Sequence, residues 1–347
     1  MNGPACPIPL ARYPVITLGH GGGGRLTAEL IDRLFGAAFG NRLLDQRHDA
    51  TVVPVPAGPL AVSTDSFVVS PLSFPGGSIG SLAVFGTAND LAMGGARPLY
   101  LTVAFILEEG LPIETLWREV LVMQKAAAEV GASIVAGDTK VVERGKGDGL
   151  YLNTTGLGAV VGSSPVGPRQ VRPGDVLLVS GDLGRHGMAV MAAREGLALA
   201  HPIESDCGSL VAAVLALLEA GLEVHCLRDL TRGGLATALN EVAAVSGTSA
   251  LVEETKLAVE DRVASACEIF GLDPLYVANE GRFAAWVRPE DADRALTILR
   301  RFPITADAVQ AGVVLPAQGP PTVTLQSRYG TTRVLDLLAG EQLPRIC

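Results

Sequence analysis

The chain has 347 residues, which is the length of one large or two medium domains and excludes a peptide module or a small disulfide scaffold. Its 27 basic and 36 acidic residues give a formal net charge of −9, which argues against nonspecific binding to nucleic acids or anionic membranes. Hydrophobic residues make up 48% of the chain and aromatic residues only 5%, so we expect a large core of Ala, Val and Leu.

Targeting and cysteine patterns are consistent with a cytoplasmic protein. The longest apolar runs, such as residues 210–218, are much shorter than the about 20 residues of a membrane span. Residues 1–14 lack the cationic start and apolar core of a secretory signal. The five cysteines are scattered and include no Cys-x-x-Cys pair, which argues against a disulfide framework and a structural zinc site.

A glycine-rich loop opens the first half of the chain. Residues 15–19 lead into HGGGGR at 20–25, and apolar residues at helical spacing follow. The Val-rich stretches 50–55 and 60–71 are bounded by Pro and Gly and enriched in β-branched residues, which predicts two strands. Asp65 lies inside the second of these predicted strands.

Helices and strands alternate further along. We expect a helix over residues 78–93, with Asp90 near its end, and a buried strand over residues 98–107. Residues 111–131 begin with an early proline, end in glycine and predict an amphipathic helix. The apolar face of that helix comprises Leu116, Val120, Met123, Ala127 and Val130.

A short buried strand is predicted over residues 132–137. The polar residues Asp138, Thr139 and Lys140 follow it directly. Polar side chains at the end of a strand can face a cleft, so these three residues are candidates for a binding site.

A Pro- and Ser-rich stretch, residues 163–174, lacks periodicity and lies between two apolar strands, which predicts a linker. We therefore divide the chain into a Pro-rich leader at 1–14, an N-terminal domain at 15–162 and a C-terminal α/β domain at 175–338. Residues 339–347 form a tail that we expect to be mobile.

Glycines and carboxylates supply a candidate metal–nucleotide site. A glycine loop before a helix can offer amide hydrogens to phosphate, although it can also be a plain linker. Carboxylates hold magnesium against a triphosphate, although a single aspartate is more often a turn former or helix cap. The joint occurrence of these residues favours a site. The candidates are Gly21, Gly22, Gly23, Gly24, Asp49, Asp65, Asp90, Asp138 and, before the glycine pair of residues 233–234, Asp229.

Three residues are candidates for the chemistry. Lys140 suits contact with phosphate or a proton relay, although most lysines only solvate a surface. Glu280 follows residues 276–278, which resemble an apolar strand, and a partly desolvated carboxylate there suits a general base; a glutamate in a hairpin turn is the alternative. Cys347, the last residue, offers a thiol that can serve as a covalent carrier.

The ordered motifs resemble those of the HypE family, the carbamoyl dehydratases of nickel–iron hydrogenase maturation. More broadly, the chain resembles the ATP-binding superfamily of aminoimidazole ribonucleotide synthetase, selenophosphate synthetase and thiamine-monophosphate kinase. This resemblance implies a two-domain mixed α/β (α+β) fold and a homodimer formed through the N-terminal sheets. The motifs are HGGGG at 20–24, STDSFVVSP at 63–71, NDLAMGGARP at 89–98, GDTKVVERGKGDG at 137–149, RDLTRGGL at 228–235, NEGR at 279–282 and the terminal PRIC.

The resemblance also implies a reaction. The partner carbamoyltransferase HypF would load a carbamoyl group onto Cys347, ATP would drive its dehydration to a thiocyanate, and a HypC–HypD complex would accept the cyanide. By motif position Glu280 would be the base, with Lys140 assisting. The resemblance implies ATP and Mg²⁺ as cofactors. The nucleotide-binding residues would be the four glycines with Asp49, Asp65, Asp90, Asp138, Thr139 and Asp229, and the metal ligands Asp65, Asp90, Asp138 and Asp229.

Two other functions remain open from the residues. The protein would be a synthetase or kinase acting on a free small molecule if its activity survived Cys347→Ala. It would be a non-catalytic nucleotide sensor if it bound ATP without hydrolysis that depends on Cys347.

Overall fold

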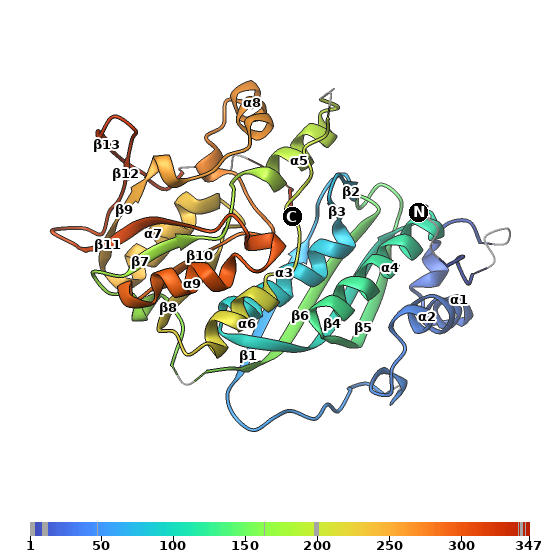
Figure 1. Cartoon of the computed structure of the whole chain (residues 1–347). Helices are drawn as coiled ribbons and strands as arrows, with labels where there is room; N and C mark the ends of the chain where they lie inside the picture. Colours follow the sequence, from blue (N-terminus) through green and yellow to red (C-terminus); the bar gives the residue numbers. More distant parts are fainter. Residues whose placement is uncertain are drawn as a thin grey trace.

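Two mixed β-sheets, one from each half of the chain, organise the structure (Figure 1). The computed structural model describes residues 4–8, 13–46, 48–162, 164–197, 201–338, 340, 343 and 345–347. Helices pack between and beside the two sheets, and the C-terminus lies between the two halves of the molecule. The predicted mixed α/β fold is confirmed.

The N-terminal sheet has four strands in the order β1-β6-β4-β5, so β1 and β5 are its two edges. Strands β4 and β5 pair in parallel, whereas β6 pairs antiparallel with both β1 and β4. The strands are β1 (Leu60–Phe67), β4 (Ala96–Glu108), β5 (Ser133–Val142) and β6 (Leu150–Val160), and a small hairpin consists of β2 (Ser73–Phe74) and β3 (Gly77–Ser78).

Helices α3 (Ile79–Met93) and α4 (Ile113–Val130) cover one face of this sheet (Figure 1). The five apolar positions predicted for α4 are all buried, which confirms the predicted helix face. Gly131 ends α4 in a left-handed conformation (φ 71°), which glycine adopts without steric cost. The chain can therefore turn directly from α4 into β5.

The opposite face of the N-terminal sheet is exposed and partly apolar. Val62 on edge strand β1 is 67% exposed and Ile106 on β4 is 41% exposed. Tyr100 and Lys140 occupy register positions on the same face, because residues two apart along a strand point to the same side. This surface is called the open sheet face below.

The glycine loop is followed by a helical segment, as predicted. Its parts are α1 (Arg25–Glu29), a π-helical turn (Leu30–Phe35) and α2 (Gly36–Phe39). Phe35 packs on Phe105 of β4, with ring centroids 4.6 Å apart. This contact attaches the segment to the same face of the sheet as α4.

The strand predicted over residues 50–55 is wrong. Residues 50–55 pair with no other strand. They are held by hydrogen bonds from side chains instead: Thr51 Oγ1 donates to the Val135 carbonyl, and the Tyr100 hydroxyl donates to the Pro54 carbonyl. Proline at 54 and 56 removes the backbone N–H groups that a ladder needs, so β-branched content alone was a misleading signal.

The C-terminal sheet has seven strands in the order β13-β12-β9-β11-β7-β10-β8. All neighbours pair antiparallel except β9 and β12. The strands are β7 (Val176–Val179), β8 (Val224–Asp229), β9 (Thr248–Glu253), β10 (Phe283–Val287), β11 (Val309–Pro316), β12 (Val323–Gln326) and β13 (Thr332–Val334).

Both faces of the central strands in this sheet are buried. On β10, Phe283 and Ala285 point towards the core shared with the N-terminal domain, whereas Ala284 and Trp286 point into a second core beneath α7. The helices of this domain are α5 (Arg185–Arg194), α6 (Val211–Glu219), α7 (Gly234–Ser246), α8 (Asp261–Phe270) and α9 (Ala292–Leu299). Short 3-10 turns lie at Leu18–His20, Leu44–Gln46, Pro168–Gln170, Glu254–Lys256, Pro274–Tyr276, Pro289–Asp291 and Pro303–Thr305.

Two predicted strand boundaries need correction. Strand β5 continues through Asp138, Thr139 and Lys140, so these residues lie within the strand and not at its end. It can continue because one of its faces is the open sheet face, which tolerates polar side chains. Glu280 precedes strand β10 and does not follow a strand, because Tyr276 ends a 3-10 turn and residues 277–278 form neither helix nor strand.

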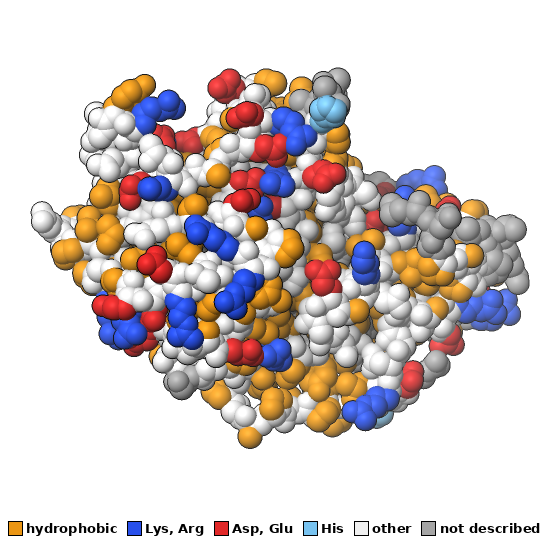
Figure 2. Space-filling view, viewed as in Figure 1, with side chains coloured by type: hydrophobic (Ala, Val, Ile, Leu, Met, Phe, Trp, Pro, Cys, Tyr) orange, Lys and Arg blue, Asp and Glu red, His pale blue; other side chains and the backbone are white. Residues whose placement is uncertain are grey.

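Charged side chains of both signs are mixed on the surface of the protein (Figure 2). Figure 2 shows Lys/Arg and Asp/Glu side chains intermingled over the C-terminal domain, and the described part of this face carries no continuous basic area. No helix among the described residues is long and apolar enough to cross a membrane.

Candidate functional site

The end of the chain is docked between the two domains. The backbone N–H of Val68 donates to the terminal Cys347 oxygen (3.0 Å), and the N–H of Ser70 donates to the Arg345 carbonyl (3.4 Å). As residue numbers rise from 68 to 70, those of their partners fall, so the tail runs antiparallel to the segment after β1. Ile346 is buried, and Arg194 of α5 donates to the Arg345 carbonyl (2.5 Å). Of the tail that we expect to be mobile, residues 345–347 are therefore held by specific contacts in this structure, whereas residues 339, 341, 342 and 344 lie outside the described residues.

Docking places the Cys347 thiol in an acidic, desolvated environment. Burial, followed by the nearby charge of Glu280, raises the pKa of this thiol to about 12, and Asp65 and Asp229 add to the shift. Arg232 acts in the opposite direction. The docked thiol is therefore un-ionised at neutral pH and is a poor nucleophile in this position.

The carboxyl of Glu280 lies in the same place and is itself buried. Burial, with the charges of Asp206, Asp229 and Asp65, raises its pKa well above the ordinary value for a glutamate. Strand β10 follows Glu280 directly, and Asn89 of α3 donates to its carbonyl (3.5 Å), so both domains hold this loop. A carboxylate with a raised pKa accepts a proton readily, which suits a general base.

Asp90 and Asp229 form the acidic wall of the site. Asp90, on α3, accepts a hydrogen bond from Ser63 of β1 (2.6 Å). Burial and the charge of Asp229 raise the pKa of Asp90 to about 6, and burial also raises the pKa of Asp229. Asp229 ends β8 and is paired with Arg228 (2.5 Å). The negative charge here is only partly compensated by protein groups.

This donor set fits magnesium delivered with a triphosphate. No three His, Cys, Asp or Glu side chains among the described residues form a ready-made metal cluster. Mg²⁺ in nucleotide sites is held by one or two carboxylates together with phosphate oxygens and water, so a full protein cage is not required. Asp65, Asp90 and Asp229 supply carboxylate oxygens whose mutual repulsion a cation would relieve.

The remaining predicted residues gather at the other edge of the sheet, around β5. Gly21 lies so close to this strand that a Cβ on it would be 2.7 Å from the Val141 backbone nitrogen, which explains the need for glycine. Lys140 pairs with Asp138 (3.1 Å), and both side chains are more than half exposed.

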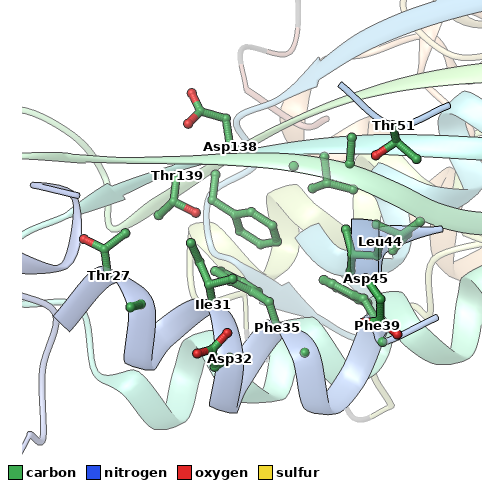
Figure 3. Close-up of a pocket in the computed structure, with 18 of the residues that line it drawn as sticks. Thr27, Ile31, Asp32, Phe35, Phe39, Leu44, Asp45, Thr51, Asp138 and Thr139 are labelled. Carbon is green, nitrogen blue, oxygen red and sulfur yellow. The ribbon is translucent and has the colours of Figure 1, made fainter. Parts of the chain in front are cut away.

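A cavity of about 520 Å³ lies beside this strand, between β5 and the segment α1–α2. Its volume is in the range of small-ligand pockets. Figure 3 shows Thr139 pointing towards the cavity and the helix that carries Ile31 and Phe35, whereas Asp138 points away from them. Aromatic and aliphatic side chains form its inner wall, and Asp49 belongs to its lining.

The predicted site residues therefore form two groups within one chain. Asp65, Asp90, Asp229, Glu280 and Cys347 meet at the domain interface, where the pKa shifts show that they interact. Gly21 with the rest of the glycine loop, Asp49, Asp138, Thr139 and Lys140 lie around β5. Strands β1 and β5 are three inter-strand steps apart, or roughly 14 Å, so Lys140 does not meet Cys347 of its own chain.

Sequence reasoning missed two residues of the interface group, Asp206 and His186. Asp206 accepts hydrogen bonds from the backbone N–H groups of Glu280 (3.3 Å) and Gly281 (3.0 Å). His186 contacts the tail through the Ile346 carbonyl (2.7 Å). No sequence pattern pointed to His186, and the sole signal for Asp206 was an acidic residue shortly before a glycine, Gly208.

Comparisons with known proteins identify relatives of both domains. The family model described as AIR synthase related protein, N-terminal domain, matches residues 47–160, and its C-terminal counterpart matches residues 172–321. Carbamoyl dehydratase HypE of Cupriavidus necator is 49% identical over 96% of this chain and 95% of that protein. Carbamoyl dehydratase HypE of Escherichia coli K12 is 44% identical over 96% of this chain and 99% of its own length.

Solved structures agree with the sequence relatives. A crystal structure of hydrogenase maturation protein HypE in complex with ATP matches 95% of this chain and 99% of its own, with 45% identity and a TM-score of 0.92. A HypE–HypF complex matches 89% of this chain and 99% of that one, with 44% identity and a TM-score of 0.78. Thiamine-monophosphate kinase of Stenotrophomonas maltophilia matches 85% of this chain and 95% of its own, but its 22% identity and TM-score of 0.63 show a shared fold alone.

Proposed function

This chain belongs to the family of HypE carbamoyl dehydratases, and we propose that it uses ATP to dehydrate a carbamoyl group on its own Cys347 to a thiocyanate. As a member of this family it is an enzyme of hydrogenase maturation, and the cyanide so formed supplies the iron of a nickel–iron hydrogenase. The observation that carries the proposal is the docked tail, whose terminal thiol lies among buried carboxylates.

The proposed reaction accounts for the acidic site. The carbamoyl oxygen is a poor leaving group, so the γ-phosphoryl group of ATP is transferred to it and ADP departs. Cleavage of the C–O bond then releases inorganic phosphate as the carbon–nitrogen triple bond forms. Both protons on nitrogen are lost, one to a base and one to the departing phosphate, and the balance is S-carbamoyl cysteine plus ATP to S-cyanocysteine, ADP, hydrogen phosphate and one proton.

Glu280 is the proposed acceptor of a nitrogen proton. Its carboxyl and the Cys347 sulfur interact electrostatically in the docked state, and its raised pKa makes it a stronger base than an exposed glutamate. Burial excludes water, which protects the phosphorylated intermediate from hydrolysis.

ATP and magnesium are the proposed cofactors. A HypE at 45% identity has been crystallised with ATP, which supports the nucleotide. Asp65, Asp90 and Asp229 would hold the metal, which when bound would neutralise charge on the triphosphate. The amide hydrogens of the glycine loop would bind phosphate oxygens, with Asp49, Asp138 and Thr139 beside them.

The chemistry of the thiol implies a tail that leaves the site. A carbamoyl group is accepted by a nucleophilic thiolate, whereas burial holds the pKa of the docked thiol at about 12. Loading by a HypF-type carbamoyltransferase therefore occurs on the undocked tail, and the existence of a HypE–HypF complex supports that partner. After dehydration the tail must leave again, because a nitrile buried at this interface cannot reach an acceptor such as a HypC–HypD complex.

A homodimer would unite the two groups of site residues. The open sheet face carries exposed apolar side chains, including Val62 and Ile106, that a second copy could cover. A two-fold arrangement that brings β5 of one copy beside β1 of the other would place Lys140 and the glycine loop against the partner copy's tail site. Lys140 would then assist the reaction in the other copy's site.

Mass spectrometry of the C-terminal peptide tests the proposal. The protein is incubated with the carbamoyltransferase and its substrates, with and without ATP. We expect Cys347 to gain the mass of a carbamoyl group, and we expect this adduct to lose the mass of one water only when ATP is present. An unmodified peptide with a demonstrably active transferase, or ATP-dependent activity that survives Cys347→Ala, would favour a synthetase or kinase acting on a free small molecule.

A further inference from the structure

His186 is completely buried and touches the tail. It lies in the first turn of α5, and its ring packs edge-on against Phe74, with centroids 5.3 Å apart. Its Nε2 is 2.7 Å from the Ile346 carbonyl oxygen, and its Nδ1 is 2.8 Å from the Ser205 hydroxyl. The imidazole therefore connects the last peptide group of the tail to the segment before α6.

These partners determine which nitrogen of His186 carries the hydrogen. A carbonyl only accepts, so Nε2 must donate to Ile346, and in the neutral ring Nδ1 must then accept from the Ser205 hydroxyl. Ser205 Oγ accepts in turn from the Cys207 N–H (3.0 Å). Burial lowers the pKa of His186, which agrees with a neutral ring. Each hydrogen bond in this series therefore donates towards the tail, from the Cys207 N–H through Ser205 and His186 to the Ile346 carbonyl.

The same segment holds the loop that carries Glu280. Asp206, next to Ser205, accepts from the backbone N–H groups of Glu280 and Gly281. The segment is itself fixed, because the Ser205 N–H donates to the Pro75 carbonyl (2.8 Å). Ser205, which contacts His186, and Asp206, which holds the Glu280 loop, are therefore adjacent residues of one segment.

We propose that His186 is a positioning residue: by holding the Ile346 carbonyl it sets the register in which Cys347 meets the Glu280 loop. The other described hydrogen bonds and ion pairs of residues 345–347 are made with Val68, Ser70, Asp148 and Arg194. Through His186 the tail is joined to that loop in two ways: by the Ser205–Asp206 path, and by the N–H of the neighbouring Gly187, which donates to the Ala278 carbonyl (3.0 Å). The consequence for the reaction rests on the proposed function, whereas the docking itself does not.

The test compares variants of the full-length protein. His186→Phe keeps a ring but removes the donor, and His186→Gln keeps an amide that can donate to Ile346 and accept from Ser205. Ser205→Ala removes only the hydroxyl that orients the ring, with little risk to folding. His225→Gln is the matched control, because His225 is also buried in this domain but pairs with Asp175, away from the tail.

Two measurements are made on each variant. The first is the rate at which iodoacetamide labels Cys347, read from the C-terminal peptide so that the other four cysteines do not interfere. The second is a single-turnover dehydration of protein already carbamoylated at Cys347. Thermal unfolding of each variant shows whether the domain remains folded.

We expect His186→Phe to label about tenfold faster than wild type, because one buried hydrogen bond of the docked state is lost. Its carbamoylation should be as fast as in wild type or faster, while its dehydration slows. Ser205→Ala should show smaller changes of the same sign, His186→Gln should recover most of the wild-type behaviour, and His225→Gln should match wild type.

Wild-type labelling in both His186→Phe and Ser205→Ala would overturn the proposal, as would faster labelling with unchanged dehydration. If His186→Phe unfolds, Ser205→Ala decides between these outcomes. Failure of the proposed function is separate: the wild type would then lose no water with ATP, although labelling of the variants would still report whether His186 holds the tail.

Discussion

At the scale of single residues, the proposed site depends on a few acidic groups that are shielded from water and only partly paired with cations. Glu280 is buried and Cys347 is partly buried beside it, and the charge of Glu280 favours the protonated form of the Cys347 thiol. A protonated thiol is a poor nucleophile, whereas a carboxylate whose pKa is raised is a stronger proton acceptor. The docked state is thus unsuited to loading the carbamoyl group and suited to dehydrating it.

The thiol predicts a pH dependence of docking. Its pKa is raised from 9 to about 12 in the docked state, so docking favours the neutral thiol, is fully supported below pH 9 and weakens as pH rises from 9 towards 12. Iodoacetamide labelling of Cys347 should therefore keep increasing with pH through this window. A labelling rate that levels off near pH 9 would show that the thiol is already exposed, and Cys6 in the same digest serves as an internal reference.

Glu280→Gln tests the base. We expect carbamoylation of Cys347 to persist and dehydration to fall by about 10²- to 10⁴-fold, because the amide cannot accept the nitrogen proton. Thermal stability should not decrease, since a neutral side chain replaces a buried carboxyl surrounded by like charges. Glu290→Gln, on the surface of the same domain, is the control. Wild-type turnover in Glu280→Gln would exclude this role.

At the scale of elements, the loop between the 3-10 turn at Pro274–Tyr276 and strand β10 is the most constrained part of the site. The backbone of Gly281 approaches the Asp206 segment so closely that a Cβ would lie 2.0 Å from the Asp206 carbonyl oxygen. Neither backbone can move without breaking the hydrogen bonds that orient Glu280. The glycine in the NEGR motif is therefore required by packing at this loop.

Gly281→Ala should accordingly disable dehydration while the two sheets remain folded. We expect the added methyl to displace Glu280, so that single-turnover dehydration is lost and thermal stability falls by a few degrees. Gly319→Ala is the matched control, since a Cβ there meets no atom within 4 Å. Full activity in Gly281→Ala would mean that the position of this loop is not set by its contact with Asp206.

At the scale of the whole molecule, the arrangement of the N-terminal sheet predicts that each site uses two copies of the chain. Lys140 is on β5 and Cys347 is docked beside the end of β1, at opposite edges of the sheet. The open sheet face provides the apolar surface through which a second copy would bind.

Mixing two inactive variants tests this arrangement. Lys140→Ala and Glu280→Gln should each be inactive alone, but a heterodimer of the two has one intact site. After subunit exchange at equal amounts we expect about a quarter of wild-type dehydration, because half of the dimers are mixed. Val62→Asp on the open sheet face should abolish the recovery and give monomers in sedimentation. Dimers without recovery would show that Lys140 does not act across the interface.

Local sequence patterns are enough to predict the mixed fold, the glycine loop with its following helix, and the buried face of α4. These features depend on local chemistry, because periodicity, capping glycine and chain stiffness act over a few residues. The motif order also indicated the family correctly, since the motifs keep the glycines and carboxylates that the fold needs at close contacts. The same local rules failed at residues 50–55, where prolines override β-branched content.

Which of the predicted site residues meet depends on the packing of the two domains, which local patterns do not contain. Asp65, Asp90, Asp229, Glu280 and Cys347 come from five different segments of the chain, and strand order places them together while it places Lys140 at the opposite edge. The contacts of His186 and Asp206 were equally hidden, because their partners lie 160 and 74–75 residues away in sequence. Burial and pairing over such distances follow from the packing of the two domains, which no local pattern encodes.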